Sequence, residues 1–277
     1  MKPSNKTVAL AAAVALVAAL AGCSKDGAKP ASGAAASAAA PAAGENPYAA
    51  LAKLPDWSGV WEPAMFARAN APRPSGPPAP PKFTPRYAAM YAAYQEKNKS
   101  TPGLNFVSPV ANCVPPGVPG SMQQPYPIEF LFTPGRVTIA IETYSMVRRI
   151  YTDGSPLEAE PDPSYQGTSV GHWEGDTLVV ETAGILPETS PINGILGHSD
   201  KMKVVERMRL TDPDSLEIKT TVEDPEVFTE PYTSTFQYAR HRDWKIREYV
   251  CAQNNHDFVD EKGRAGFSLD HKPGEKQ

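Results

Sequence analysis

Residues 166–183 read Gln-Gly-Thr-Ser-Val-Gly-His-Trp-Glu-Gly-Asp-Thr-Leu-Val-Val-Glu-Thr-Ala. The Gly-Asp pair at 175–176 stands between two runs of apolar or alternating residues, which is a strong signal for a β-hairpin. The arm after the pair contains 178–180, whose β-branched and apolar side chains suit a buried strand. The arm before it, at 172–174, carries His, Trp and Glu, the densest group of potentially reactive side chains in the chain. The stretch therefore predicts two paired strands and a first place to look for function.

Further segments on both sides of this hairpin alternate with a period of two. They are predicted as strands at 54–62, 128–133, 136–143, 145–152, 166–174, 177–183, 201–211, 214–223, 232–240 and 244–251. Turn-forming pairs such as Pro134-Gly135 and Asp153-Gly154 connect successive strands. Because no helical stretch lies between successive strands, a parallel α/β sheet is disfavoured. The pattern predicts a mainly β fold, an antiparallel meander that closes into a lipocalin-like barrel without free edges.

The rest of this domain, 51–255, is predicted to hold one short helix and long Pro-rich loops. The helix is expected at 85–97, and the loops at 70–85 and 100–127. Residues 256–277 are polar and are expected to be a partly disordered tail.

The N-terminus predicts export. A positive start precedes an apolar run that ends in Leu20-Ala21-Gly22-Cys23, which resembles the lipobox of bacterial lipoproteins. We therefore expect a signal peptide at 1–22, lipid on Cys23, and an Ala/Gly/Pro-rich tether at 23–50. The alternative is an ordinary signal peptide with a chance cysteine at its cleavage site. The lipoprotein reading places the protein in the bacterial cell envelope, facing the periplasm at the inner or the outer membrane, with the lipid bilayer as its partner through acylated Cys23.

Two cysteines remain once Cys23 is assigned to lipid. Cys113 and Cys251 are expected to pair, because thiols in an oxidising compartment generally do. The alternative is a pair of free thiols.

Strand alternation also predicts which charged side chains face the barrel interior. Arg148, Glu206 and Glu248 each share the apolar face of their predicted strand. An unpaired charge in a core is costly, so such groups must be paired, neutralised or hydrated. We predict an internal polar cluster of these three residues, with His172 and Glu174 as further candidates. A buried ion-pair network that fixes strand register, or a phase error that places these groups outside, remain alternatives.

Charge and motif content narrow the function classes. The formal net charge of −4 argues against a nucleic-acid partner. His172 and His198 lack partners at metal-ligand spacing, so no metal site is predicted. The chain has no phosphate-binding or dinucleotide motif, and no cofactor is expected. Residues 184–199 are rich in Gly, Pro, Ser and Asn and are predicted to form a loop over the barrel mouth.

Several motifs together resemble a large uncharacterised family of exported bacterial proteins, over roughly residues 54–255. They are Cys113-Val-Pro-Pro-Gly117, Arg148-Arg-Ile-Tyr-Thr-Asp-Gly154, Gly171-His-Trp-Glu-Gly-Asp-Thr-Leu-Val-Val180, Val205-Glu-Arg207 and Glu248-Tyr-Val-Cys251. The resemblance implies no activity. Gly59-Val60-Trp61 is similar to the opening of the first lipocalin strand, although a long Pro-rich stretch follows where a lipocalin continues directly.

Three functions are compatible with these residues. In the first, the barrel binds a small, mostly apolar ligand, with Arg148 holding an oxygen substituent and Trp173, Glu174 and Tyr238 lining the site. In the second, the protein is a cofactor-free isomerase, hydratase or lyase with Glu206 or Glu248 as base and His172 or Arg148 stabilising negative charge. In the third, it is a structural envelope lipoprotein. A deep cavity that reaches both Glu206 and His172 would favour the enzyme. An apolar cavity with the carboxylates tied to arginines would favour ligand binding, and a filled barrel would favour the structural role.

Overall fold

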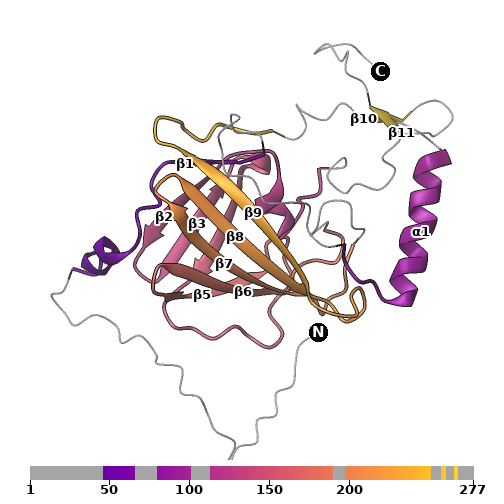
Figure 1. The fold of residues 1–277 in the computed structure, drawn as a ribbon, viewed down its shortest axis with the longest axis horizontal. Coiled ribbons are helices and arrows are strands. Elements are labelled where there is room, and N and C mark those ends of the chain that lie inside the picture. The colour runs from indigo at the N-terminus through magenta and orange to yellow at the C-terminus, as the bar shows by residue number, and fades with distance from the viewer. Residues whose placement is uncertain are drawn as a thin grey trace, which may run out of the picture. The chain divides into compact units, whose positions relative to one another are not determined.

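The structure is a computed structural model that describes residues 46–65, 80–100, 113–189, 197–250, 257–259 and 265–267. Nine strands form one closed barrel in sequence order (Figure 1), which confirms the predicted mainly β barrel. The strands are β1 (Val60–Pro63), β2 (Ile128–Thr133), β3 (Arg136–Ile141), β4 (Met146–Tyr151), β5 (Thr168–Glu174), β6 (Thr177–Ala183), β7 (Lys203–Asp212), β8 (Ser215–Glu223) and β9 (Tyr232–His241).

The hairpin predicted from 166–183 is formed by β5 and β6. Glu174 pairs with Thr177 next to the turn, and Gly171 pairs with Val180 further along. Gly175 occupies the turn with φ +60°, a conformation that glycine adopts without the steric cost of a Cβ. The Gly-Asp pair therefore sets the register of both strands.

The barrel departs from a pure antiparallel meander at one place. β4 and β5 run parallel and are joined by two residue pairs, Ile150 with Ser169 and Tyr151 with Val170. The connection between them, 152–167, has to travel back along the barrel before β5 can begin. This parallel seam was not predicted, because period-two alternation gives no information on strand direction.

The prediction of a strand at 244–251 is wrong, since residues 244–250 form no strand. β9 already pairs with β8 on one side and with β1 on the other. The ring is closed at that point, so no edge remains for a further strand.

The helix α1 (Pro85–Ser100) is the single α-helix among the described residues. Its start is capped by the Thr84 hydroxyl, which accepts a hydrogen bond from the Tyr87 amide at 3.3 Å. Phe83, just before the helix, stacks on Phe228 with ring centroids 5.9 Å apart. No helix in the described part of the chain is long and apolar enough to span a membrane. Within the segment expected to be a disordered tail, β10 (Asp257–Val259) pairs with β11 (Ala265–Phe267).

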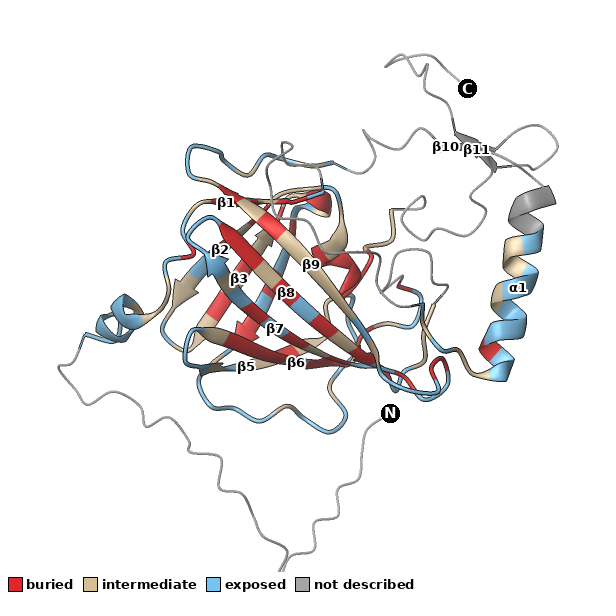
Figure 2. Ribbon diagram, in the orientation of Figure 1, coloured by how far each residue is buried: buried red, intermediate tan, exposed pale blue. Residues whose placement is uncertain are grey.

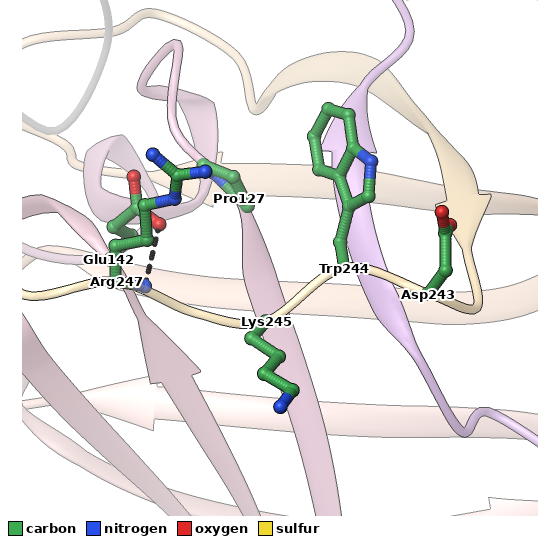
Figure 3. Close-up of a pocket in the computed structure, with 6 residues that line it drawn as sticks. All are labelled: Pro127, Glu142, Asp243, Trp244, Lys245 and Arg247. Carbon is green, nitrogen blue, oxygen red and sulfur yellow. Dashed lines mark hydrogen bonds between the residues drawn. The ribbon is translucent and has the colours of Figure 1, made fainter.

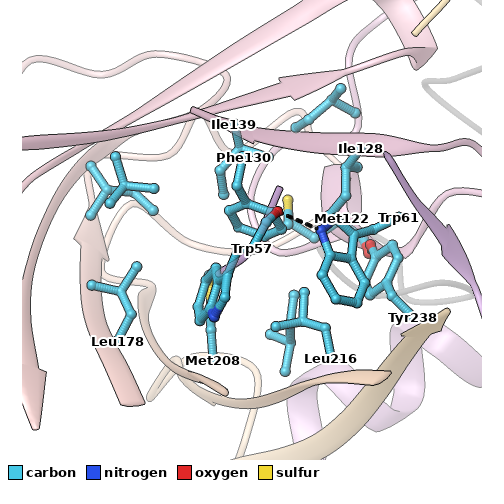
Figure 4. Packing of buried hydrophobic residues seen from close by; sticks show 14 of the residues in the cluster. Trp57, Trp61, Met122, Ile128, Phe130, Ile139, Leu178, Met208, Leu216 and Tyr238 are labelled. Atoms are coloured by element: carbon cyan, nitrogen blue, oxygen red, sulfur yellow. Dashed lines mark hydrogen bonds between the residues drawn. The ribbon is translucent and has the colours of Figure 1, made fainter. Parts of the chain in front are cut away.

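Buried residues line the barrel strands (Figure 2), and the apolar ones among them divide into two clusters. The larger cluster is drawn in Figure 4 and includes Trp57, Trp61, Met208 and Tyr238. The smaller one includes Tyr87, Val204, Val222 and Phe228. On β7 and β8, the paired residues Glu206 and Thr220 lie between members of the two clusters, and both are buried. A polar layer therefore separates the clusters.

Residues 116–122, which we call the plug, extend between the same two clusters. All seven are buried, and the segment ends in the 3-10 helix η3 (Gly120–Gln123). Val118 belongs to the smaller cluster and Met122 to the larger. The long Pro-rich loop predicted at 100–127 thus contributes part of the core.

Candidate functional site

Arg148 and Glu206 form an ion pair in the polar layer of the barrel. Arg148 on β4 is 1% exposed and Glu206 on β7 is 0% exposed, which confirms that both face inward. Arg148 Nη1 donates to Glu206 Oε1 at 3.1 Å, and Nη2 donates to Oε2. A bidentate guanidinium–carboxylate pair is the strongest form of this interaction. The negative charge of Glu206 is therefore matched by a positive charge at the same place.

Two hydroxyl groups accept further hydrogen bonds from the Arg148 guanidinium. Arg148 Nη2 donates to Thr182 Oγ1 at 3.0 Å, and Nε approaches Ser169 Oγ at 3.4 Å. The two hydroxyl oxygens are themselves 2.8 Å apart. Of the alternatives that the sequence left open, this geometry favours a buried ion-pair network over a proton-transfer centre.

The network connects the strands on both sides of the parallel seam. Arg148 lies on β4, whereas Ser169, Thr182 and Glu206 lie on β5, β6 and β7. The backbone pairing between β4 and β5 consists of only two residue pairs. The side-chain hydrogen bonds of the network add further links across this short pairing. The network therefore has a structural role in closing the barrel.

Tyr238 and Trp173 both have packing roles inside the barrel. The buried hydroxyl of Tyr238 donates to the Met122 carbonyl of the plug. Burial, with the charge of Glu206 as a further cause, raises the pKa of Tyr238, which keeps the phenol neutral. Trp173 is partly buried and meets Trp57 edge-on at 5.5 Å between centroids. We expected both residues to line a ligand site, and they instead contact core residues.

The expectation that His172 and Glu174 join the internal cluster is wrong. Both side chains lie on the outer wall, where His172 Nε2 is 3.2 Å from Glu174 Oε1. Arg207 Nη2 donates to Glu174 Oε2 at 2.7 Å, and this bond holds the pKa of Glu174 below its usual value. Neighbouring residues of a strand face opposite sides, so the inward position of Trp173 forces both outward.

Glu248 was also placed incorrectly. It is exposed, because the segment that carries it is not a strand of the barrel. Glu206 and Glu248 therefore do not share an interior space, and the predicted internal cluster lacks Glu248.

The segment Gly197-His198-Ser199-Asp200 contains no catalytic triad. His198 Nε2 is 2.9 Å from Thr189 Oγ1, while Ser199 Oγ donates to Asp224 at 2.8 Å. Burial lowers the pKa of His198, and Thr189 is 0% exposed. The bond between Thr189 and His198 joins the described ends of 184–199, the loop that we expected over the barrel mouth, and the bond to Asp224 attaches its end to the residue after β8.

Residues 243–250, which follow the barrel, are called the C-terminal segment. A pocket of about 580 Å³ lies beside this segment, at the rim of the barrel. We call it the rim pocket (Figure 3). Its lining residues are Pro127, Glu142, Asp243, Trp244, Lys245 and Arg247. The Arg247 amide donates to Glu142 Oε2 at 2.9 Å, which fastens the segment to the end of β3. No ion pair within the described residues involves Lys245 or Arg247.

Trp244 is the aromatic wall of the rim pocket and is 41% exposed. One face of its indole stacks on His241, with centroids 3.7 Å apart and planes 8° from parallel. His241 Nε2 is in turn 3.0 Å from Glu62 Oε2 on β1. The indole is therefore supported from behind and presents a rigid apolar surface.

The backbone beside Glu142 is strained. Tyr144 and Ser145, in the 3-10 helix η4 (Thr143–Ser145), have φ values of 56° and 48°, a left-handed conformation that is costly for non-glycine residues. Ser145 Oγ donates to the Tyr249 carbonyl at 3.1 Å, and the Tyr249 ring contacts that of Tyr144 at 5.3 Å. Burial raises the pKa of Tyr144 to about 12. The turn thus positions both Glu142 and the C-terminal segment.

Sequence reasoning did not find the rim pocket. Trp244 fell within the strand predicted at 244–251, and Glu142 within the strand predicted at 136–143. One signal was present, since Asp243, Lys245 and Arg247 surround this tryptophan with charges of both signs. A buried core strand rarely carries so many charges.

The comparisons with known proteins add no family. The chain matches no protein-family model and no curated protein. The resemblance to exported bacterial proteins therefore stays a prediction. In the described part of the chain, no group of three or more His, Cys, Asp or Glu residues is arranged to hold a metal ion.

Proposed function

We propose that this protein is a lipid-anchored protein of the bacterial cell envelope that binds a small, mostly apolar ligand. The rim pocket carries the proposal. Its volume of about 580 Å³ is in the range of small-molecule sites. Trp244 offers the ligand an exposed, supported aromatic face. The site differs from the barrel interior that the sequence suggested, because the plug and the core side chains occupy that space.

Two observations bear on the alternatives. An enzyme with Glu206 as base loses support, because both carboxylate oxygens are bonded to Arg148. A structural envelope lipoprotein is the second candidate, and the packed plug and core favour it. The two remaining candidates differ in whether the rim pocket takes a ligand.

Ligand binding can be tested with a neutral aromatic probe. Isothermal titration calorimetry of the purified protein with 2-naphthalenemethanol should show binding, with Trp244 as the contact, because its ring is exposed while Trp57 and Trp61 are buried. We expect Trp244→Ala to weaken binding at least about tenfold, since aromatic stacking contributes about 0.5–1.5 kcal/mol beyond area burial. His172→Ala, on the outer wall, is the matched control. If no neutral or charged ring compound binds, or if Trp244→Ala leaves binding unchanged, the rim pocket is not a ligand site and the structural role stands.

The lipid anchor needs a separate test. Metabolic labelling with an alkyne-bearing fatty acid should mark the wild-type protein and leave Cys23→Ala unmarked. Labelling that persists in the variant would show that Cys23 is not the acylated residue.

A further inference from the structure

We infer that the ligand of the rim pocket is a zwitterion, an α-amino acid with an aromatic or similarly flat apolar side chain. This inference rests on the proposed function and specifies its ligand. It follows from the charges that line the pocket and from their position relative to Trp244.

The pocket carries charges of both signs in equal number. Glu142 and Asp243 are acidic, and Lys245 and Arg247 are basic. Each of the four side chains lacks an ion-pair partner within the described residues. Among these side chains, the carboxylate of Glu142 alone makes a hydrogen bond within the described residues, which it accepts from the Arg247 backbone amide. A purely anionic ligand would leave two carboxylates without a partner, and a purely cationic ligand would leave two cations without one. A zwitterion can match one carboxylate and one cation of the pocket at the same time.

Glu142 and Arg247 are the pair best placed for such a head group. Figure 3 shows Trp244 and Arg247 on the same side of the segment, with Pro127 between them and Glu142 next to Arg247, whereas Lys245 points to the other side. The hydrogen bond from the Arg247 amide keeps this segment beside the Glu142 carboxylate. An α-carboxylate can therefore meet the guanidinium while the neighbouring ammonium group meets Glu142.

The aromatic side chain of the ligand would then reach Trp244. The indole is held from behind by His241, so its free face is available for stacking. The short distance from an α-carbon to its side-chain ring suits a pocket whose polar and aromatic walls are separated by one proline.

Four probes that share a phenyl ring separate the contributions of the head group. They are L-phenylalanine, 3-phenylpropionate without the ammonium, 2-phenylethylamine without the carboxylate, and neutral 2-phenylethanol. Binding to the full-length protein and to each variant is measured by isothermal titration calorimetry. Because each charge contact at a partly exposed site contributes at most about 1 kcal/mol, we expect phenylalanine to bind about two- to fivefold more tightly than either singly charged probe.

Two variants assign the contacts. Arg247→Gln should weaken phenylalanine and phenylpropionate about fivefold and leave phenylethylamine unchanged. Glu142→Gln, which keeps an acceptor for the Arg247 amide, should weaken phenylalanine and phenylethylamine and leave phenylpropionate unchanged. Arg209→Gln, whose partner is Glu217 on the outer wall, is the control.

The outcomes distinguish this inference from the proposed function. Equal affinity for all four probes, lost in Trp244→Ala, would overturn the zwitterion and keep a ring-binding pocket. Preference for one singly charged probe would also overturn it. If neither the four probes nor 2-naphthalenemethanol bind, the proposed function fails together with the inference.

Discussion

At the scale of single residues, the internal ion pair makes the clearest prediction. Glu206→Gln removes the countercharge of Arg148, whose guanidinium remains buried. Breaking a buried pair from one side typically costs about 3–5 kcal/mol. We expect urea denaturation to show a loss of that size in the free energy of unfolding. Glu217→Gln is the control, because its partner Arg209 is on the outer wall, and it should cost less than about 1 kcal/mol.

A double substitution provides the complementary result. Arg148→Met combined with Glu206→Leu removes both charges, and replacing a buried pair by apolar residues is often neutral. We expect the double variant to be more stable than Glu206→Gln alone. A Glu206→Gln protein as stable as the wild type would show that the pair does not hold the barrel at its seam.

Asp56 predicts a pH dependence of stability. Hydrogen bonds from Ser58, with Arg240 nearby, lower the pKa of Asp56 to about 2. A carboxyl with a lowered folded-state pKa stabilises the protein above its unfolded-state pKa, and this contribution disappears as the pH falls towards 2. Asp56→Asn should therefore cost less than about 1 kcal/mol near neutral pH, because the side chain is 64% exposed.

The measurement for Asp56 is a series of denaturation curves between pH 7 and pH 2. The gap between wild type and Asp56→Asn should narrow on acidification. A gap that stays constant with pH would mean that the charge of Asp56 does not contribute.

Alternation predicted the inward residues of β4 and β7 correctly, and the error at His172 and Glu174 arose because both were proposed as internal beside Trp173, their immediate neighbour on β5. Arg148 and Glu206 were placed inside correctly, because the strands that carry them belong to the barrel wall. Glu248 was misplaced because its segment alternates like a strand but has no edge to pair with. Alternation records the amphipathic character of an extended segment, whereas pairing depends on the rest of the chain.

At the scale of elements, the plug was hidden from sequence reasoning for a related reason. The segment 116–122 contains glycine and proline, which are typical of exposed loops, and it has no regular period. The structure buries it because Val118 and Met122 each complete a different apolar cluster. Packing between distant parts of the chain determined its place, and no local pattern encodes that.

Gly117 tests how tightly the plug is held. It has φ +71°, and a Cβ built on it would lie 2.7 Å from Thr189 Oγ1. Gly175 in the hairpin turn also has a positive φ, at +60°, but a Cβ there would meet nothing within 4 Å. Gly175→Ala should cost about 1–2 kcal/mol from backbone strain alone. Gly117→Ala should cost more, by about 1–3 kcal/mol, since it adds overpacking.

Thermal and urea unfolding of the two alanine variants separates the cost of backbone strain, which both share, from the cost of the steric clash with Thr189, which Gly117→Ala alone has. Equal losses would indicate that the plug moves aside easily and that Thr189 does not confine it. In that case the barrel interior could open to a ligand, and the structural account of the plug would need revision.

At the scale of the whole molecule, the predicted Cys113–Cys251 disulfide would link two parts that define the rim pocket and the core. Cys113 lies three residues before the first residue of the plug, and Cys251 directly follows the C-terminal segment that carries Trp244 and Arg247. Cys251 lies outside the described residues, so the bond stays a prediction. If it forms, reduction should lower the free energy of unfolding by about 2–5 kcal/mol. It should also weaken probe binding at Trp244, because the segment loses one of its attachments.

Non-reducing peptide mapping tests the disulfide directly, since a protein in which both cysteines can be alkylated has no such bond. Cys113→Ser combined with Cys251→Ser should then reproduce the reduced protein in both stability and binding. A double variant that binds as tightly as the oxidised wild type would show that the disulfide does not position the pocket residues. The hydrogen bonds of Glu142 and Ser145 would then be what holds the segment in place.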